Sequence, residues 1–71
     1  MRKYLVVYEN TKTGYSAYVP DLPGVIATGK TKIIIEKNIF SAIQFHLDGL
    51  KEEHLRIPRA SAASEILVFA V

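Results

Sequence analysis

The chain has 71 residues, no cysteine and a formal net charge of +2, and 49% of its residues are hydrophobic. The length fits one small domain, and the lack of cysteine excludes disulfides and thiolate metal sites as supports for its core. A small monomer has little interior for so many apolar side chains, so we expect a homo-oligomer, either a dimer or a tetramer. The nine lysines and arginines form no run of three, so their charge neither supports nor excludes a nucleic-acid partner.

The sequence contains no targeting or membrane-spanning pattern. The N-terminal residues MRKYLVVYEN lack the apolar region of a signal peptide. No apolar stretch approaches the roughly 18 residues that a membrane span requires. We therefore expect a cytoplasmic protein with no membrane partner.

Three strands are expected in the first half of the chain. Residues 3–9 are β-branched and aromatic and are apolar on both faces, which predicts a central strand. A polar loop that ends at Gly14 predicts a hairpin to a second strand over residues 15–19. Pro20 ends that strand because it has no N–H. The Pro/Gly corner over residues 20–24 then leads to a short third strand over residues 25–28.

One helix and one more strand are expected in the second half. Thr31 is a good N-cap, and residues 32–53 carry an apolar stripe at helical spacing, which predicts one long helix. Residues 65–71 are almost wholly apolar and predict a last strand. The fold class is therefore α+β in the order βββ-α-β. It comprises an antiparallel sheet, one long helix packed on one face, and a final strand parallel to the first.

The hairpin and its corner resemble the signature of the HicB-like antitoxin family, and the resemblance extends along the helix, over roughly residues 4 to 58. The matching residues are the run Tyr15–Gly24, then Ala27–Gly29, Thr31, Asn38, Ile39, Ala42, Ile43 and His46–Leu50, with Ile57 and Pro58 at the end. The resemblance implies a shortened RNase H-like fold. It also implies an antitoxin that binds and inhibits a HicA-like toxin, a small ribonuclease that cleaves mRNA.

Two features depart from the family pattern. Many HicB-like proteins carry a second, DNA-binding domain, whereas no helix-turn-helix or ribbon-helix-helix pattern follows the last strand here. We therefore expect a single HicB-like domain over residues 1–71, with nucleic acid as a partner only indirectly. The helix also differs, because Ile33 and Ile34 stand where acidic residues are usual and Phe40 stands where a charged residue is usual.

Four residues of the hairpin and corner are candidates for contact with the toxin: Tyr15, Tyr18, Asp21 and Leu22. We expect Asp21 and Leu22 to be exposed, and a corner fixed by prolines loses little entropy on binding. The competing interpretation is that this segment only holds the sheet corner in place.

A second apolar line on the helix is the candidate oligomer interface. Ile33, Phe40 and Leu47 are spaced seven residues apart, outside the main apolar stripe for the first two, and the apolar excess of the chain favours an interface there. The alternative is that these residues are scattered on the surface or are covered by residues 55–64.

No catalytic, metal-binding or cofactor-binding residue is predicted. The first strand lacks the central carboxylate with which an RNase H-like nuclease holds metal ions. His46 lies on the apolar stripe and has no Ser, Cys or second His one turn away. We therefore expect no enzymatic activity and no cofactor. Two other functions stay open, namely an orphan oligomeric interaction module for another protein or nucleic acid, and a small hydrolase or nuclease.

Overall fold

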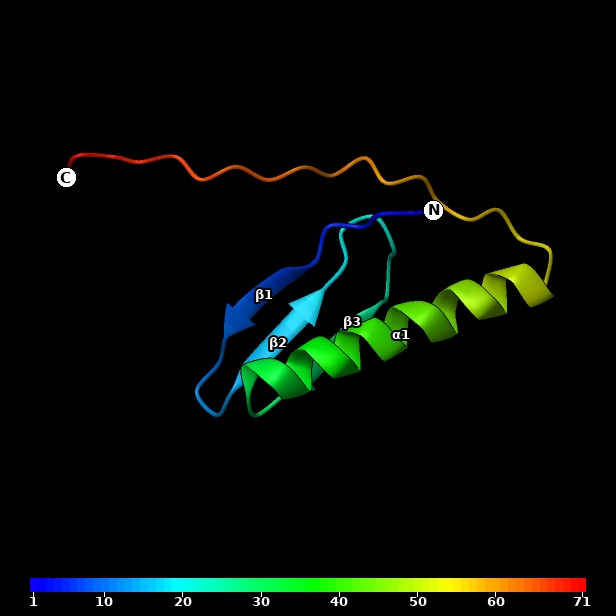
Figure 1. The fold of residues 1–71 in the computed structure, drawn as a ribbon, viewed down its shortest axis with the longest axis horizontal. Coiled ribbons are helices and arrows are strands. Elements are labelled where there is room, and N and C mark those ends of the chain that lie inside the picture. The colour runs from blue at the N-terminus through cyan, green and yellow to red at the C-terminus, as the bar shows by residue number, and fades with distance from the viewer.

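The computed structural model describes residues 1–71. The chain forms a three-stranded antiparallel sheet with one helix on one face, followed by an irregular C-terminal segment (Figure 1). The strands are β1 (Val7–Asn10), β2 (Tyr15–Tyr18) and β3 (Ile26–Gly29), and they lie side by side in chain order. Helix α1 (Lys32–Glu52) follows β3 directly. The predicted α+β class, the three strands and the single long helix are confirmed.

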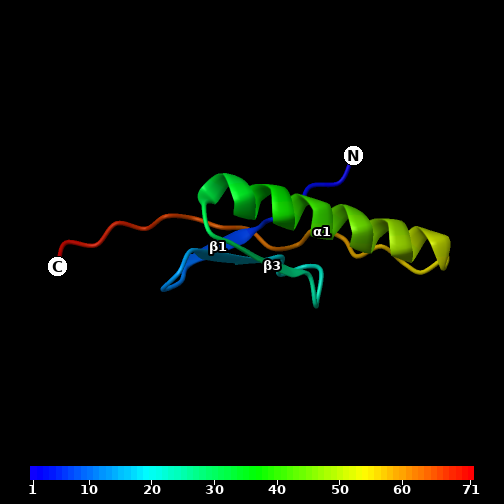
Figure 2. The ribbon, with the colours of Figure 1, turned by 90° about the horizontal axis from the view of Figure 1, so that it is seen from below.

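The register of the sheet divides its side chains between two faces. Tyr8, Ala17 and Ala27 form one row across the three strands, and Val7, Tyr18 and Ile26 form the next row. Because neighbouring residues of a strand point to opposite faces, the first row lies on the α1 side and the second on the other. Figure 2 shows α1 over one side of the sheet only.

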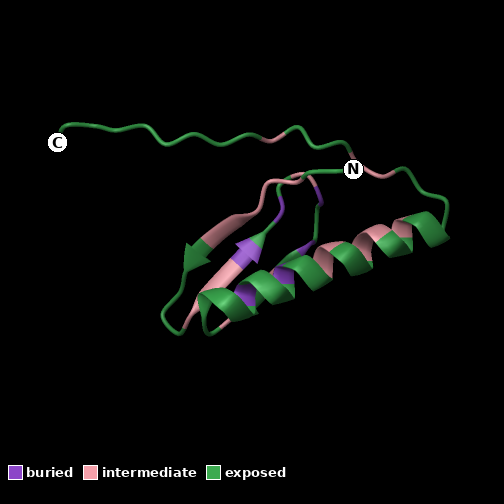
Figure 3. Ribbon diagram, viewed as in Figure 1, coloured by how far each residue is buried: buried purple, intermediate pink, exposed green.

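The core lies between the sheet, the corner and α1. Its six buried residues are all apolar: Ala17, Val19, Leu22, Val25, Ile35 and Ile39. Figure 3 places the buried segments on β2, on the chain between β2 and β3, and on the inner side of α1. So small a core makes each of these side chains a large part of what stabilises the fold.

Both ends of α1 are capped by local hydrogen bonds. At the start, the Ile34 N–H donates to the hydroxyl of Thr31 at 3.2 Å, which confirms the predicted N-cap. At the end, His54 has a left-handed backbone with φ 58°. The Leu55 N–H then donates to the Leu50 carbonyl at 2.9 Å, which closes the helix as a glycine usually does at this place.

The glycines at Gly14 and Gly29 allow the hairpin, β3 and α1 to approach closely. A Cβ on Gly29 would lie 2.8 Å from the backbone nitrogen of Ile35. A Cβ on Gly14 would collide with the carbonyl oxygen of Gly29. Both glycines therefore serve close backbone packing.

The position of the first strand corrects one prediction. β1 begins at Val7, four residues later than expected, and it lies at an edge of the sheet, not in its centre. The corner explains the late start: Val7 pairs with Tyr18, so residues 3–5 lie opposite the chain that turns away at Pro20. A central position in the sheet therefore does not explain why both faces of this strand are apolar.

The structure does not show the predicted last strand over residues 65–71. Residues 55–71 have no regular secondary structure and pair with no strand. We divide them into the linker, residues 55–62, and the tail, residues 63–71. Figure 1 shows the tail running away from the body in an extended path.

Candidate functional site

The two candidate tyrosines of the hairpin lie on opposite faces of the sheet. Tyr15 pairs with Asn10 and Gly29 and packs against the core on the α1 side. Tyr18 lies on the other face and is 43% exposed. The structure therefore does not bring them together in one contact surface, and Tyr18 is the one that faces solvent beside other apolar side chains.

Tyr18 is the middle of an apolar row on the uncovered face of the sheet, which we call the open face. Val7 is its neighbour on β1, and Ile26, which is 65% exposed, is its neighbour on β3. Cross-strand neighbours lie about 5 Å apart, so the three side chains form one continuous strip. Sequence reasoning had singled out Tyr18 but missed Val7 and Ile26, although the alternation along each strand places all three on this face.

The structure corrects the expected exposure of Leu22. Its side chain is 0% exposed and fills the space under the corner. The corner is a closed loop, in which the Leu22 N–H donates to the Val19 carbonyl and the Val25 N–H donates to the Leu22 carbonyl, both at 3.1 Å. Gly24 completes it with φ 85°, and Leu22 therefore holds the corner from inside.

Asp21 is half-buried and binds the linker. Its carboxylate accepts hydrogen bonds from the Ser61 N–H, the Ala62 N–H and the Ser61 hydroxyl, each at 2.9 Å. These bonds favour the charged carboxylate and lower the pKa of Asp21 below its ordinary value, the Ala62 N–H contributing most. The corner aspartate thus joins two segments that lie 40 residues apart in the chain.

The helix candidates do not form one exposed line. Ile33 and Phe40 are both exposed, whereas Leu47 is half-buried and packs against the core. The linker does not cover Ile33 or Phe40, so the alternative that residues 55–64 shield them is wrong. The opposite flank of α1 is also apolar, because Ile34 and Phe45 are exposed there.

A basic cluster forms where the N-terminal segment meets the linker. Arg2 from the N-terminal segment lines a hollow of about 680 Å³ together with Arg56 and Arg59 of the linker. None of the three forms an ion pair, since the one salt bridge of the structure joins Lys32 and Glu36 at 3.5 Å. The sequence does not reveal this cluster because its arginines are far apart along the chain.

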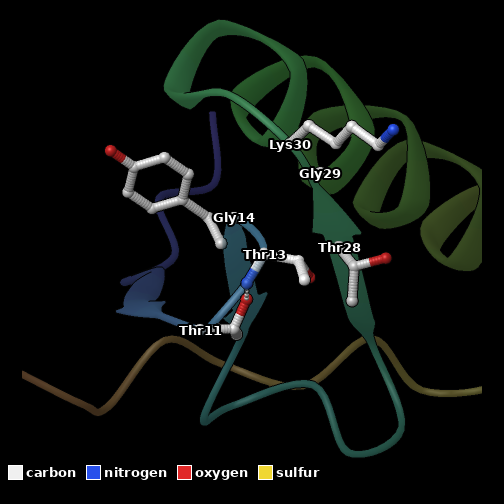
Figure 4. Close-up of a pocket in the computed structure, with 7 residues that line it drawn as sticks. Thr11, Thr13, Gly14, Thr28, Gly29 and Lys30 are labelled. Atoms are coloured by element: carbon white, nitrogen blue, oxygen red, sulfur yellow. Dashed lines mark hydrogen bonds between the residues drawn. The ribbon is translucent and has the colours of Figure 1, made fainter.

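A polar pocket lies at the end of the hairpin (Figure 4). Its volume is about 330 Å³, and its lining is mostly threonine and glycine: Thr11, Thr13, Gly14, Tyr15, Thr28, Gly29 and Lys30. It contains no carboxylate and no histidine, and Tyr15 and Lys30 are its only titratable side chains.

Two further observations concern the whole chain. No three His, Asp or Glu side chains come together as metal ligands would. The chain contains no helix with both the length and the apolar content needed to cross a membrane.

The comparisons with known proteins point to one family. A family model described as a HicB-like antitoxin of bacterial toxin–antitoxin systems matches residues 4–68. A UPF0150 protein of Thermoplasma acidophilum is 41% identical over 69 residues, which cover 96% of this chain and 99% of that protein. An uncharacterized 14.9 kDa protein from the rep-hol intergenic region of Haemophilus phage HP1 is 30% identical over 64 residues, which cover 90% of this chain. The chain spans about half the length of that phage protein, at 48%. Because the family model covers the sheet, the corner, α1 and the linker, this chain belongs to the HicB-like antitoxin family.

Proposed function

We propose that this chain is an antitoxin that binds and inhibits a HicA-type toxin, a small ribonuclease that cleaves mRNA. It acts in the cytoplasm by covering the toxin, has no enzymatic activity of its own, and works as a homo-oligomer of the single domain formed by residues 1–71. The observation that carries this proposal is the family match, which extends over the whole sheet and helix.

The open face of the sheet is the surface that we assign to the toxin. It presents the strip of Val7, Tyr18 and Ile26, with no element of this chain packed over it (Figure 2). Aromatic side chains in the middle of an apolar strip are typical centres of protein interfaces. The closed corner beside the strip keeps β2 and β3 in register, so the strip is formed before binding.

The experiment is a binding measurement with any HicA-type toxin that the genome of the source organism encodes. We expect the wild-type protein to bind this toxin and to stop its cleavage of mRNA. Tyr18→Ala should weaken binding about 10-fold, as is usual for an aromatic residue at an interface centre. Phe45→Ala is the matched control, because Phe45 is an exposed aromatic residue on α1, away from the open face.

The outcomes distinguish a failure of the proposed antitoxin function from a wrong assignment of the contact surface. Failure of the folded wild-type protein to bind any HicA-type toxin of its own genome would refute the antitoxin function. Full binding by Tyr18→Ala, or equal losses in Tyr18→Ala and Phe45→Ala, would show that the toxin contacts another surface. Circular dichroism of each variant shows that the fold is kept.

A second candidate function is supported by the basic cluster. Three arginines without ion-pair partners around one hollow are suited to phosphate groups of a nucleic acid. In this case the chain is an orphan interaction module that binds RNA. Binding to a single-stranded RNA should then weaken with salt, and the double variant Arg56→Gln/Arg59→Gln should lower the slope of log K against log salt by about 1.4. RNA binding that is absent, or unchanged in this variant, contradicts this function.

A further inference from the structure

The basic cluster continues into a second hollow. This hollow has a volume of about 390 Å³, shares Arg2 and Arg59 with the first, and is also lined by Lys3. Together with Arg56, the two hollows gather every arginine of the chain. The five lysines outside the hollows are outnumbered by the seven carboxylates. Four cations therefore lie together in a protein whose remaining side chains carry a net negative charge.

No carboxylate of the chain balances this local charge. Neither hollow is lined by Asp or Glu, and the one salt bridge of the structure joins Lys32 and Glu36. Cations that are held close together repel one another, and an anionic ligand relieves that repulsion. The planar fork of arginine matches the oxygens of a phosphate group. Because the two hollows adjoin through two shared arginines, they suit a ligand with successive phosphates.

Hydrogen bonds hold the two charged segments together against this repulsion. The hydroxyl of Tyr4 donates to the Pro58 carbonyl at 2.6 Å, which joins the N-terminal segment to the linker (Figure 1). The carboxylate of Asp21 accepts from the N–H groups of residues 61–62, each at 2.9 Å. The linker is therefore fixed on both sides of Arg59, and the cluster is formed before any ligand arrives.

Asp21 positions the linker without neutralising the arginines. Its carboxylate accepts three hydrogen bonds from the linker and takes part in no ion pair. The negative charge of Asp21 alone would repel a phosphate group. Its contribution to the binding of an anion therefore comes from the place that it gives to the linker, and this contribution has the opposite sign to that of its charge.

The lining of the two hollows is poor in groups that distinguish one base from another. Apart from its cations it consists of Met1, Ile57 and Ala60. It has no Asn, Gln or carboxylate for the edges of adenine or cytosine, and no aromatic ring on which a base can stack. The backbone of a nucleic acid carries one phosphate per nucleotide whatever the base is, so it fits this lining.

We infer that the basic cluster and Lys3 bind the phosphodiester backbone of single-stranded RNA, with little regard to its bases, and that Tyr4 and Asp21 are the positioning residues that assemble this site. The inference rests on the second function proposed above. It adds which part of the RNA is contacted, a fourth cation, and the two side chains that hold the linker arginines beside Arg2.

The first experiment measures the binding of a short fluorescent oligouridylate to the full chain at several salt concentrations. If the four cations each neutralise one phosphate, the slope of log K against log salt should be about −2.8 for a single strand. Oligoadenylate and oligocytidylate should bind within about 2-fold of oligouridylate, because phosphate contacts carry no sequence information. Inorganic phosphate is added in a separate arm as the free anion.

The second experiment uses the opposite effects of charge and position at Asp21. Asp21→Asn removes a negative charge near the arginines, which by charge alone should strengthen RNA binding. We expect it instead to weaken binding about 3-fold or more, because the linker arginines are no longer held in place before binding. Glu9→Gln is the matched control, since it also removes one carboxylate but Glu9 lies on β1 and forms no bond to the linker. This control should bind at least as tightly as wild type.

Tyr4→Phe tests the other positioning residue without a change of charge. It removes only the hydroxyl that binds the Pro58 carbonyl, and it should also weaken RNA binding about 3-fold. Tyr8→Phe is the matched control, because Tyr8 packs against the core as Tyr4 does but its hydroxyl forms no hydrogen bond. Circular dichroism of each variant shows that the sheet and α1 are kept.

The outcomes separate this inference from the functions on which it builds. A wild-type protein that binds no RNA at low salt, or one whose site takes inorganic phosphate only, overturns both this inference and the second function, and leaves the antitoxin function standing. If wild type binds RNA but a folded Tyr4→Phe or Asp21→Asn variant binds it as tightly or more tightly, the positioning role of that residue is refuted while RNA binding stands. A preference above about 10-fold among the three oligonucleotides would show that the site reads bases.

Discussion

Leu22→Ala tests whether the corner is held from inside by a buried side chain. Leu22 is fully buried among only six buried residues, and Leu→Ala in a core costs about 2–5 kcal/mol, depending on how far the neighbours collapse. Small proteins unfold with about 0.05–0.15 kcal/mol per residue, which for this chain means roughly 4–11 kcal/mol. We therefore expect the variant to lose about 3 kcal/mol, a large part of the total.

The measurement is urea denaturation followed by circular dichroism. Wild type and variants are compared at the same protein concentration, because the stability of any self-associating protein depends on its concentration. Ile26→Ala is the matched control, because Ile26 also lies in the sheet region but is mostly exposed, and its loss should stay within about 0.5 kcal/mol. A loss below about 1 kcal/mol for Leu22→Ala, or equal losses in the two variants, would refute the role of Leu22 as the support of the corner.

Three further predictions concern charge, backbone and chemistry. Hydrogen bonds from the linker lower the pKa of Asp21 below its ordinary value of 3.8. The linker contact therefore stabilises the fold above that pH and is lost as the pH falls through the lower pKa of the folded state. The protection of the Ala62 N–H from exchange should follow this pH course, and Asp21→Asn should abolish the protection at every pH. His54→Gly should stabilise the protein by about 1 kcal/mol in thermal unfolding, because glycine adopts the left-handed backbone at the helix end without strain, and a destabilised variant would contradict this. The purified protein should not cleave RNA or DNA with Mg²⁺ or Mn²⁺; cleavage that disappears in Glu9→Gln or Asp48→Asn would show that it is an enzyme.

The parts of the fold that depend on neighbours in the sequence could be predicted. Thr31 caps the helix because the capping bond joins residues three apart, and Gly24 takes the positive φ that its place in the corner requires. The helix stripe is also local, since helical spacing alone places Ile35 and Ile39 on the same face. These features need no knowledge of the rest of the chain.

The errors arise where a side chain or strand depends on distant segments. Leu22 lies between a proline pair in a turn, where no alternation says which way a side chain points, and only the packing of α1 under the corner settles it. The apolar tail carries the signal of a strand, but a strand also needs a partner edge, and the sequence does not say in which chain that edge lies. The basic cluster combines Arg2 with Arg56 and Arg59, which no local pattern connects.

The hydrogen bonds of Asp21 also shorten the part of the chain that is free to move. Without these bonds the Tyr4 hydroxyl, which donates to the Pro58 carbonyl, still holds the linker and leaves thirteen residues free beyond Pro58, whereas a chain held at Ala62 has nine. For a flexible chain, the volume sampled by the end grows as about the three-halves power of its length, so the Asp21 contact concentrates the tail roughly 1.7-fold around its point of exit. That gain equals about 0.3 kcal/mol of chain entropy that is already lost before any binding, and protonation of the Asp21 carboxylate removes it.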